Sequence, residues 1–355
     1  MSQNDNSIDH SIKTGGTTVN VTALGIDIAK NVFQLHGVDA DGKIVLQKKV
    51  SREKLLQFVA QLPACKIGME SCGGSNYWAK EFQALGHEVK LISPQFVKPY
   101  VKSNKNDMRD AEAICEALTR PTMRFVSVKT LEQQDIQAIH RVRSRVIKER
   151  TALVNQIRGL LAEYGIVIAQ GISHIRKGLP IILEDSENKL THISRQLFNN
   201  LLCELRDKDS KVKEYDNEIK QISQRLEVCK RIMKIEGVGV LTATALVATI
   251  GDATVFKNGR EMAAFLGLVP RQYSSGGKER LLGISKRGDR YLRCLLIHGA
   301  RAAVTRSNKL SEKKASWLKS VEERRGRNRA TVALANKNAR IIWAMMVNKS
   351  DYKQA

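Results

Sequence analysis

Residues 21–50 read VTALGIDIAKNVFQLHGVDADGKIVLQKKV, and this stretch decides the fold class of the chain. Its apolar and β-branched runs predict three successive strands, at Ala23–Ile28, Val32–Val38 and Ile44–Val50. One acid, Asp27, interrupts the first of these apolar strands. An ionised carboxylate in such a setting is costly unless it is paired or bound to a cation. Asp27 is therefore the first candidate functional residue.

The next segments alternate between helices and strands. SREKLLQFVAQL, from Ser51, has helical spacing after a serine cap, and CKIGME is a short buried strand that ends in Glu70. SNYWAKEFQALG is a helix that Gly86 terminates, and HEVKLIS is a further strand. The order βββαβαβ is typical of an α/β domain with a mixed sheet.

From Leu131 onward the pattern predicts long helices. A heptad seam with spacings of three and four residues comprises Val212, Tyr215, Ile219, Ile222, Leu226 and Cys229. A looser seam runs from Ile139 to Tyr164 and carries Arg150 in one slot. Two interpretations stay open, an intramolecular helical hairpin and a coiled coil with a second chain.

The charge of the chain is large and unevenly distributed. The formal net charge is +23 over 355 residues, which favours a polyanionic partner such as nucleic acid or an acidic membrane surface. Residues 1–130 hold 17 lysines and arginines against 13 acids, whereas residues 256–349 hold 22 against 6. We therefore expect phosphate binding by the second half. No apolar run is long enough to span a bilayer and no signal peptide is evident, so a cytoplasmic protein without a membrane partner is expected.

Three further acids join Asp27 as candidates. Glu70 closes a strand, and Asp107 and Asp110 share one face at the start of a helix. Each alone has an ordinary structural explanation, but the two strands and the helix would meet at one end of a ribonuclease H-like sheet. Four converging carboxylates repel one another unless hard divalent cations bind, and Mg²⁺ prefers oxygen ligands. Two such ions about 3.5–4 Å apart suit phosphodiester chemistry.

Two glycine-rich turns complete the set of candidates. Gly237-Val238-Gly239, between apolar segments, resembles a helix-hairpin-helix element whose backbone N–H groups can hold a phosphate. RQYSSGGKERLLGISKRGDRYLR, from Arg271, places two serines and two glycines beside a dense run of basic residues.

Taken together, these motifs resemble the DEDD transposases of bacterial insertion sequences, family one-hundred-ten, which also includes the pilin-gene DNA invertases. The motifs are GIDIAKNVF, GMESCG, KNDMRDAEAI, FLGLVPRQYSSGGK and GISKRGDRYLR, and the similarity runs from about residue 21 to about residue 347. Residues 1–19 are polar and lack periodicity, so we expect a disordered tail there. The resemblance implies a RuvC-like catalytic domain at 20–128. It also implies a helical, coiled-coil region at 129–230 and a mainly α, basic transposase domain at 231–349.

The resemblance also assigns roles to residues. Asp27, Glu70, Asp107 and Asp110 match the four metal-binding acids, and Ser275, the serine that precedes glycine, matches the nucleophile. Ser274 is its immediate neighbour. The residues that we expect to hold nucleic acid are Gly237, Gly239, Lys278, Arg280, Lys286, Arg287, Arg290 and Arg293.

The implied activity is a DNA transposase that cuts and rejoins the strands of a mobile element through a transient phosphoserine link. Two Mg²⁺ ions, donor and target DNA, a noncoding bridge RNA and a homodimer that assembles to a tetramer are implied with it, in the bacterial cytoplasm at the nucleoid. Three alternatives remain. They are a DNA invertase, a Holliday-junction-resolvase-like nuclease of the same fold that uses water, and a non-catalytic nucleic-acid-binding protein.

Overall fold

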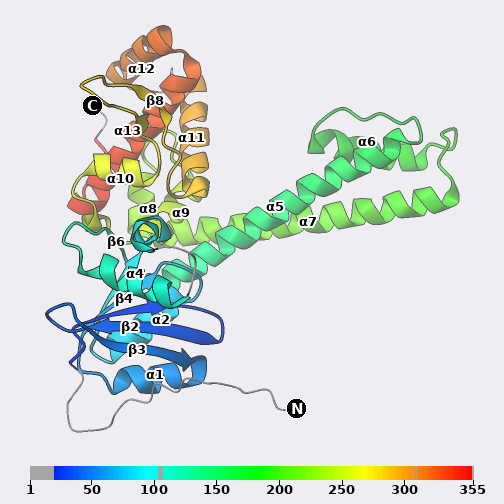
Figure 1. Cartoon of the computed structure of the whole chain (residues 1–355). Helices are drawn as coiled ribbons and strands as arrows, with labels where there is room; N and C mark the ends of the chain where they lie inside the picture. Colours follow the sequence, from blue (N-terminus) through cyan, green and yellow to red (C-terminus); the bar gives the residue numbers. More distant parts are fainter. Residues whose placement is uncertain (1–19, 103–106, 307, 309, 354–355) are drawn as a thin grey trace, which may run out of the picture. The chain divides into compact units, whose positions relative to one another are not determined.

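The computed structural model describes residues 20–102, 107–306, 308 and 310–353, and the expected disordered tail, 1–19, lies outside them. The chain divides into two compact units, one up to Val128 and one from Lys129 (Figure 1). Each unit has its own hydrophobic core.

The first unit is built on a six-stranded mixed sheet of order β3-β2-β1-β4-β5-β6. Its strands are β1 (Ala23–Asp27), β2 (Val32–Val38), β3 (Ile44–Ser51), β4 (Lys66–Glu70), β5 (Glu88–Ile92) and β6 (Phe125–Val126). β1, β4 and β5 run parallel, and β2, β3 and β6 pair antiparallel to their neighbours. The predicted mixed sheet is thereby confirmed, and it is compatible with a RuvC-like fold. The two-residue strand β6 was not predicted.

Helices cover both faces of this sheet. They are α1 (Arg52–Ala60), α2 (Ser75–Ala84), α3 (Pro94–Val97), the 3₁₀ turn η1 (Lys98–Tyr100) and α4 (Asp107–Thr119). Leu24 and Ile26 of β1 share a core cluster with residues of α1 and α2. Ala23, on the alternate face of β1, clusters with residues of α4. The two faces of the sheet are thus covered by α1 and α2 on one side and by α4 on the other.

The packing of α4 on the sheet depends on Gly25. A Cβ atom at this position would lie 2.3 Å from the Ala111 carbonyl oxygen and 2.6 Å from the Cys115 backbone nitrogen. Both are backbone atoms of α4, so they cannot rotate away as a side chain would. Only glycine permits this approach of helix to strand.

The second unit is mostly helical. Its elements are α5 (Leu131–Ala162), α6 (Ile172–Glu184), α7 (His192–Arg225), α8 (Glu227–Ile232), α9 (Val240–Ile250), η2 (Ala253–Val255), α10 (Gly259–Phe265), β7 (Pro270–Gln272), β8 (Leu281–Ile284), α11 (Arg290–Thr305), α12 (Glu312–Arg325) and α13 (Arg327–Asn348). Helices α8–α13 surround one core. The hairpin of β7 and β8 was not predicted, because its short strands are fully polar or exposed and carry no alternation.

The long helices α5 and α7 pack against each other within the chain (Figure 1). Ile222 of the predicted seam lies in a cluster with Ile136 of α5 and Ala248 of α9. The helix ends at Arg225, before the last two seam positions. The seam is therefore buried in an intramolecular helical packing, and a coiled coil is not confirmed.

Ion pairs replace apolar contacts midway along this helical pair. Asp209 of α7 accepts hydrogen bonds from Arg150 of α5 at 2.9 Å and from Arg176 of α6 at 2.7 Å. Partial burial alone would raise the pKa of the Asp209 carboxyl, but the two guanidinium groups hold it below its ordinary value. Arg150 therefore occupies its seam slot because Asp209 faces it.

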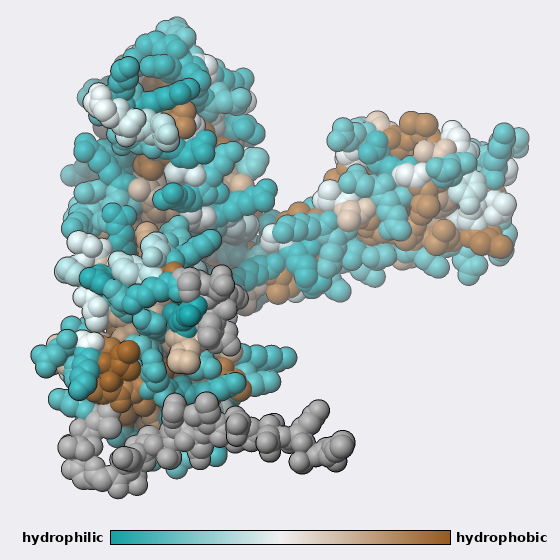
Figure 2. Space-filling model, in the orientation of Figure 1, coloured by the Kyte–Doolittle hydropathy of each residue, from teal (hydrophilic) through white to brown (hydrophobic). Residues whose placement is uncertain are grey.

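The surface is largely hydrophilic, and apolar residues gather at places on both units. Figure 2 shows apolar residues over the end of the helical pair next to α6. Val167, Ile181 and Ile193 are exposed there. Within the described ranges, no helix combines the length and the hydropathy that a membrane span requires.

We predict that Gly25→Ala lowers the free energy of unfolding by about 3 kcal/mol, because helix and strand backbones must separate to admit the methyl group. Thermal or urea unfolding of the full chain measures the effect. Gly73→Ala is the control in the same unit, since a Cβ atom there meets nothing within 4 Å. Equal stability of the two variants would contradict the proposed contact.

We also predict that Asp209→Ala destabilises the chain by on the order of 1–3 kcal/mol at neutral pH, because Arg150 loses its partner. The folded-state pKa of Asp209 is depressed, so its contribution is present at neutral pH and disappears as the pH falls through that pKa. Wild type and variant should therefore converge in stability in acid. Asp207→Ala, at an exposed position of the same helix, should behave as wild type throughout. A constant difference at every pH would exclude the ion pair as its cause.

Candidate active site

The two strand-borne acids lie at neighbouring carboxyl ends of the sheet. β1 and β4 run parallel, and their register pairs Ile26 with Met69. Asp27 and Glu70 follow directly as the last residues of their strands, and both are half-buried. Because adjacent strands lie about 4.8 Å apart, the two carboxylates share one small region of the sheet edge.

Both acids belong to the sheet face that α4 covers. Side chains alternate along a strand, so Asp27 shares a face with Gly25, and Glu70 shares one with Gly68. A Cβ atom on Gly25 would meet the backbone of α4, and one on Gly68 would lie 3.1 Å from a side-chain carbon of the same helix. The pair of glycines therefore brings α4 down over the two strands that end in acids.

The direction of α4 brings its amino end to the carboxyl ends of these strands. The Cys115 thiol donates to the Ala23 carbonyl oxygen at 3.6 Å, whereas Ala111, one helical turn earlier, faces a position two residues further along β1. α4 therefore runs antiparallel to β1. The positive end of its dipole lies at the sheet edge, where it favours carboxylates.

Asp110 lies in the first turn of α4, immediately before Ala111, and is half-buried. Asp107 is the first residue of the helix, and its side chain lies outside the described part of the structure. Three of the four predicted acids, Asp27, Glu70 and Asp110, are thus carried by elements that meet at one edge. The fourth belongs to the same helical turn by sequence.

The charges of both strand acids affect the Cys72 thiol. Partial burial raises the pKa of this thiol, and the charges of Glu70 and then Asp27 raise it further. A single sulfur atom is therefore within the electrostatic reach of both carboxylates. The sequence analysis did not single out Cys72, and its place two residues after Glu70 was the available signal.

The donor set at this edge suits a divalent cation. Carboxylate oxygens are the ligands that Mg²⁺ prefers, and the acids come from three elements of one sheet face. Among the described side chains, no three His, Cys, Asp or Glu residues form a group that could hold a metal ion, and the Asp107 side chain lies outside that comparison. The chemistry of the donors thus fits the predicted metal. The described side chains by themselves do not form a complete ligand shell.

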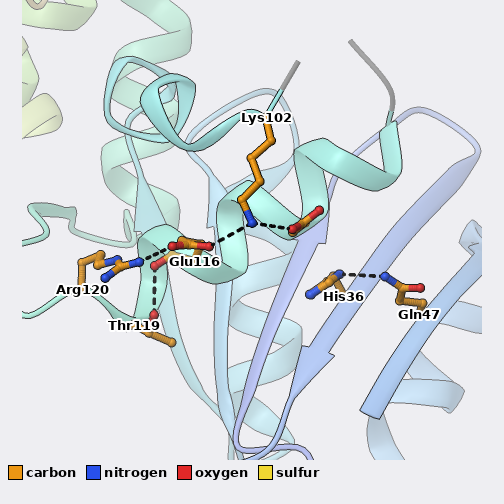
Figure 3. A network of polar contacts seen from close by, with 7 residues as sticks. His36, Gln47, Lys102, Glu116, Thr119 and Arg120 are labelled. Carbon is orange, nitrogen blue, oxygen red and sulfur yellow. Dashed lines mark hydrogen bonds and ion pairs between the residues drawn. The ribbon is translucent and has the colours of Figure 1, made fainter. Parts of the chain in front are cut away.

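A network of charges joins Lys102 to side chains of α4 (Figure 3). Lys102 lies 2.9 Å from Oε1 of Glu112 and 3.7 Å from Oε2 of Glu116. Arg120 also pairs with Glu116. The hydrogen bond to Glu112 is the main reason that the pKa of Lys102 is raised. Lys102, which follows η1 closely in the sequence, is thereby tied to the second and third turns of α4.

His36 of β2 adds a neutral polar group on this face. It pairs with Gly25 across the sheet, and its Nδ1 lies 3.4 Å from Nε2 of Gln47 (Figure 3). Burial lowers the pKa of His36, which outweighs the nearby charge of Glu112. The imidazole is therefore neutral at physiological pH. The sequence analysis identified neither His36 nor the network of Lys102 as neighbours of the acids.

Ser275 lies in the second unit, in the tight turn of an exposed hairpin. Its carbonyl oxygen accepts a hydrogen bond from the Lys278 N–H at 3.1 Å, and Gly276 and Gly277 between them have φ of +56° and +76°. Two central residues with positive φ define a turn of type I′, which suits β-hairpins and requires glycine or a similar residue. Among the described residues, no hydrogen bond engages the Ser275 hydroxyl. Ser274, in contrast, accepts one from the Gln272 amide at 3.1 Å.

The basic residues of this segment divide into two groups. Lys278, Arg280, Lys286, Arg287 and Arg290 are all exposed. Arg293 is 8% exposed, and it donates to the Leu266 and Arg287 carbonyl oxygens at 3.2 and 3.1 Å. These bonds hold the loop before α11 in place. Arg293 therefore differs from the expected phosphate contact, because its guanidinium is used within the fold.

Gly237 and Gly239 form the turn between α8 and α9. Gly237 has φ of +87°, and a Cβ atom on it would lie 2.7 Å from the Gly299 carbonyl oxygen of α11. Gly239 is exposed and caps the amino end of α9. Gly237 is thus required for helix packing, and only Gly239 presents open backbone that a phosphate could approach.

Comparisons with known proteins place the chain in a family. A DEDD transposase model of the IS110 type matches residues 24–166, and a model described as transposase of the IS116/IS110/IS902 family matches residues 229–315. These matches cover both the acids and the serine hairpin.

Several relatives match over most of their length. The transposase for insertion sequence element IS1111A of Coxiella burnetii is 50% identical over 94% of this chain and 92% of its own length. A probable family 20 transposase of Pseudomonas aeruginosa is 45% identical over 94% of this chain and 99% of its own. A pilin gene-inverting protein of Moraxella bovis is 25% identical over 78% of this chain and 81% of its own. On the strength of these matches, the chain belongs to the IS116/IS110/IS902 family of transposases.

Proposed function

We propose that this transposase cleaves and rejoins DNA with the acids of the first unit and with Ser275 of the second. The observation that carries the proposal is the convergence of β1, β4 and the amino end of α4, each bearing one of the half-buried acids. Acids gathered at one sheet edge, with the positive end of a helix dipole beside them, can hold cations that polarise a phosphodiester. Membership of the transposase family supplies DNA as the substrate.

In this proposal Asp27, Glu70, Asp107 and Asp110 hold divalent cations. Bound Mg²⁺, two ions per site, would withdraw charge from the scissile phosphate and stabilise the leaving oxygen. The chain's own contribution is to fix the donors. Gly25 sets the height of α4 over the strands, and Lys102 pairs with Glu112 of the helix.

Ser275 would act as the nucleophile. Its Oγ would form a bond to phosphorus while the bond from phosphorus to one DNA oxygen breaks, and the serine proton would end on that oxygen. The result is a phosphoserine link that retains the energy of the phosphodiester, so the reverse attack by a DNA hydroxyl would rejoin a strand. The open turn supports this role, because Gly276 and Gly277 leave space for a DNA backbone.

The exposed cations near the serine would hold the DNA strands. Lys278 and Arg280 lie on the hairpin itself, and Lys286, Arg287 and Arg290 lie between it and α11. Each can pair with a phosphate oxygen and offset negative charge that develops at the reacting phosphorus. Gly239 would add a backbone N–H at the start of α9.

Assembly and guidance belong to the same proposal. The acids of one protomer would act with the serine unit of another, in a homodimer that assembles to a tetramer. A noncoding bridge RNA would pair with donor and target DNA and so choose the sites. Support for both comes from the resemblance to the family and from the net charge of +23, which leaves ample positive surface for RNA as well as DNA.

Inversion of a DNA segment is the second candidate. The relative that inverts a pilin gene favours it, and the cleavage chemistry would be the same. A resolvase-like nuclease that uses water in place of Ser275 is distinguished by its lack of a covalent intermediate. The covalent adduct separates the serine mechanism from the water-based one, because hydrolysis by water leaves none.

We predict that cleavage requires Mg²⁺ and the acid cluster. Asp27→Asn or Asp110→Asn should lower strand cleavage by about 100-fold or more, because the cation loses a charged ligand. The same variants should bind DNA normally and unfold at the same or higher temperature, since fewer like charges crowd the sheet edge. Cleavage is measured on labelled DNA with guide RNA, with Mg²⁺ and with EDTA. Undiminished cleavage in EDTA would refute the metal site.

We predict that Ser275→Ala folds and binds DNA but forms no covalent adduct and no recombinant product. Its hydroxyl is exposed and unengaged by the described residues, so its loss should change stability by less than about 0.5 kcal/mol. Denaturing electrophoresis after incubation with labelled DNA, RNA and Mg²⁺ detects the adduct as a slow-migrating band. Ser274→Ala is the matched control and should retain most activity. An adduct that persists in Ser275→Ala, or one that is absent from the active wild type, would exclude this nucleophile.

A further inference from the structure

A large groove lies in the second unit beside the stem of the serine hairpin. Its volume is about 1000 Å³, and α10, α12 and α13 contribute its walls. Pro270 of β7 and Ile284 of β8 are also among its lining residues. The groove therefore borders the stem of the hairpin.

The groove is positively charged without compensation. Arg260, Arg329, Lys337 and Arg340 line it, and none of its lining residues is an Asp or Glu. α13 supplies three of these cations and has no acid along its 22 residues. A solvated helix face of ordinary composition would mix both signs. This stripe of cations is instead suited to a polyanion.

Among the residues that the structure describes, no carboxylate neutralises these charges. In the described part of the chain, none of the four cations lies within ion-pair distance of a carboxylate, whereas the neighbouring Lys314 pairs with Glu236 at 2.7 Å. Burial lowers the pKa of Lys337, and repulsion from Lys314 and Arg340 lowers it further. The cations thus repel one another, and an anion in the groove would relieve that repulsion.

The same groove offers aromatic and apolar surface. Trp317 of α12 is half-buried, and the Lys337 ammonium lies 4.4 Å from the centre of its ring. Trp343 is held by hydrogen bonds from its indole N–H to the Ala253 and Phe256 carbonyl oxygens, at 3.1 and 3.2 Å. Ile341, which is half-buried, adds apolar area. Aromatic rings beside cations bind unpaired bases by stacking while the cations hold the phosphates.

A base-paired duplex uses only half of this surface. The bases of a duplex are paired and stacked inside, and only the backbone phosphates face outward. The tryptophans and the apolar residues of the groove would therefore contact no base. An acidic peptide would likewise use the charge and leave the aromatic surface idle. A strand with unpaired bases uses both.

We propose that this groove binds a short single-stranded nucleic-acid segment, with its phosphates on Arg260, Arg329 and Arg340 and a base against Trp317. The inference deepens the proposed function and rests on it for the nucleic-acid nature of the partner. From Pro270 to Ser275 the hairpin extends about 16 Å at the usual rise of a strand. A strand seated in the groove would therefore lead toward the serine within a few nucleotides.

The experiment compares two charge-matched double variants of the full chain. Arg329→Gln/Arg340→Gln removes two groove cations, and Lys313→Gln/Lys319→Gln removes two exposed cations of α12 outside the lining. Fluorescence anisotropy measures the binding of oligothymidine, oligouridine and a short DNA duplex. The groove variant should bind single strands about tenfold more weakly, with a salt slope lower by about 1.4, and the control should change little.

Photocrosslinking gives a local measurement. Oligonucleotides carrying 5-iodouracil, as DNA and as RNA, should crosslink to the peptide that contains Trp317, and Trp317→Leu should remove that crosslink. Preference for the DNA or the RNA probe would identify the source of the strand. Crosslinks confined to other peptides, equal affinities of the two double variants, or an equal loss of duplex binding would overturn the proposal.

The outcome is independent of the nucleophile. If Ser275 does not attack DNA, the crosslink at Trp317 persists in wild type and in Ser275→Ala, and the groove stands. If the groove proposal fails, the Ser275 adduct can still form. The two failures therefore have different signatures.

Discussion

The contact between Gly25 and the backbone of α4 is the constraint on which the acid site depends. Two backbones approach so closely there that a single methyl group would collide with a carbonyl oxygen at 2.3 Å. Because α4 is held at this height and runs antiparallel to β1, its first turn must end beside the carboxyl ends of β1 and β4. The places of Asp27, Glu70 and Asp110 are thus consequences of sheet register and helix packing.

The second unit is fixed by a different kind of interaction. His140 of α5 bonds Tyr291 of α11 through Nδ1 and Thr244 of α9 through Nε2, both at 3.0 Å. Burial lowers the pKa of His140 to about 4, so the imidazole stays neutral and the connection does not titrate at physiological pH. Three helices are joined at this point, and Tyr291 directly follows the basic segment behind the serine hairpin. The buried polar contact thereby gives that exposed segment a rigid base.

The sequence could predict what depends on local pattern. Strand alternation gave the three N-terminal strands, and acids at the ends of apolar runs pointed to the sheet edge. Other features depend on contacts distant in sequence and left no local signal. Arg150 interrupts a seam because Asp209 faces it, and Arg293 is buried because two carbonyl oxygens require a donor. The groove on α13 could not be predicted either. In the sequence its cations belong to one long basic stretch, and only the folded helix brings them into one groove with Trp317.

The division between a rigid acid site and an exposed serine follows from what each must do. Carboxylates that share a cation need fixed spacing, and a sheet edge covered by a helix provides it. On the proposed function, the attacking serine must instead reach a phosphorus that the protein does not enclose, and the glycine turn of an exposed hairpin would provide that reach. On the proposed function, neither part is competent alone, because the serine lacks an activated phosphate and the acids lack an attacking group. Cleavage would then await the assembly of both parts on nucleic acid.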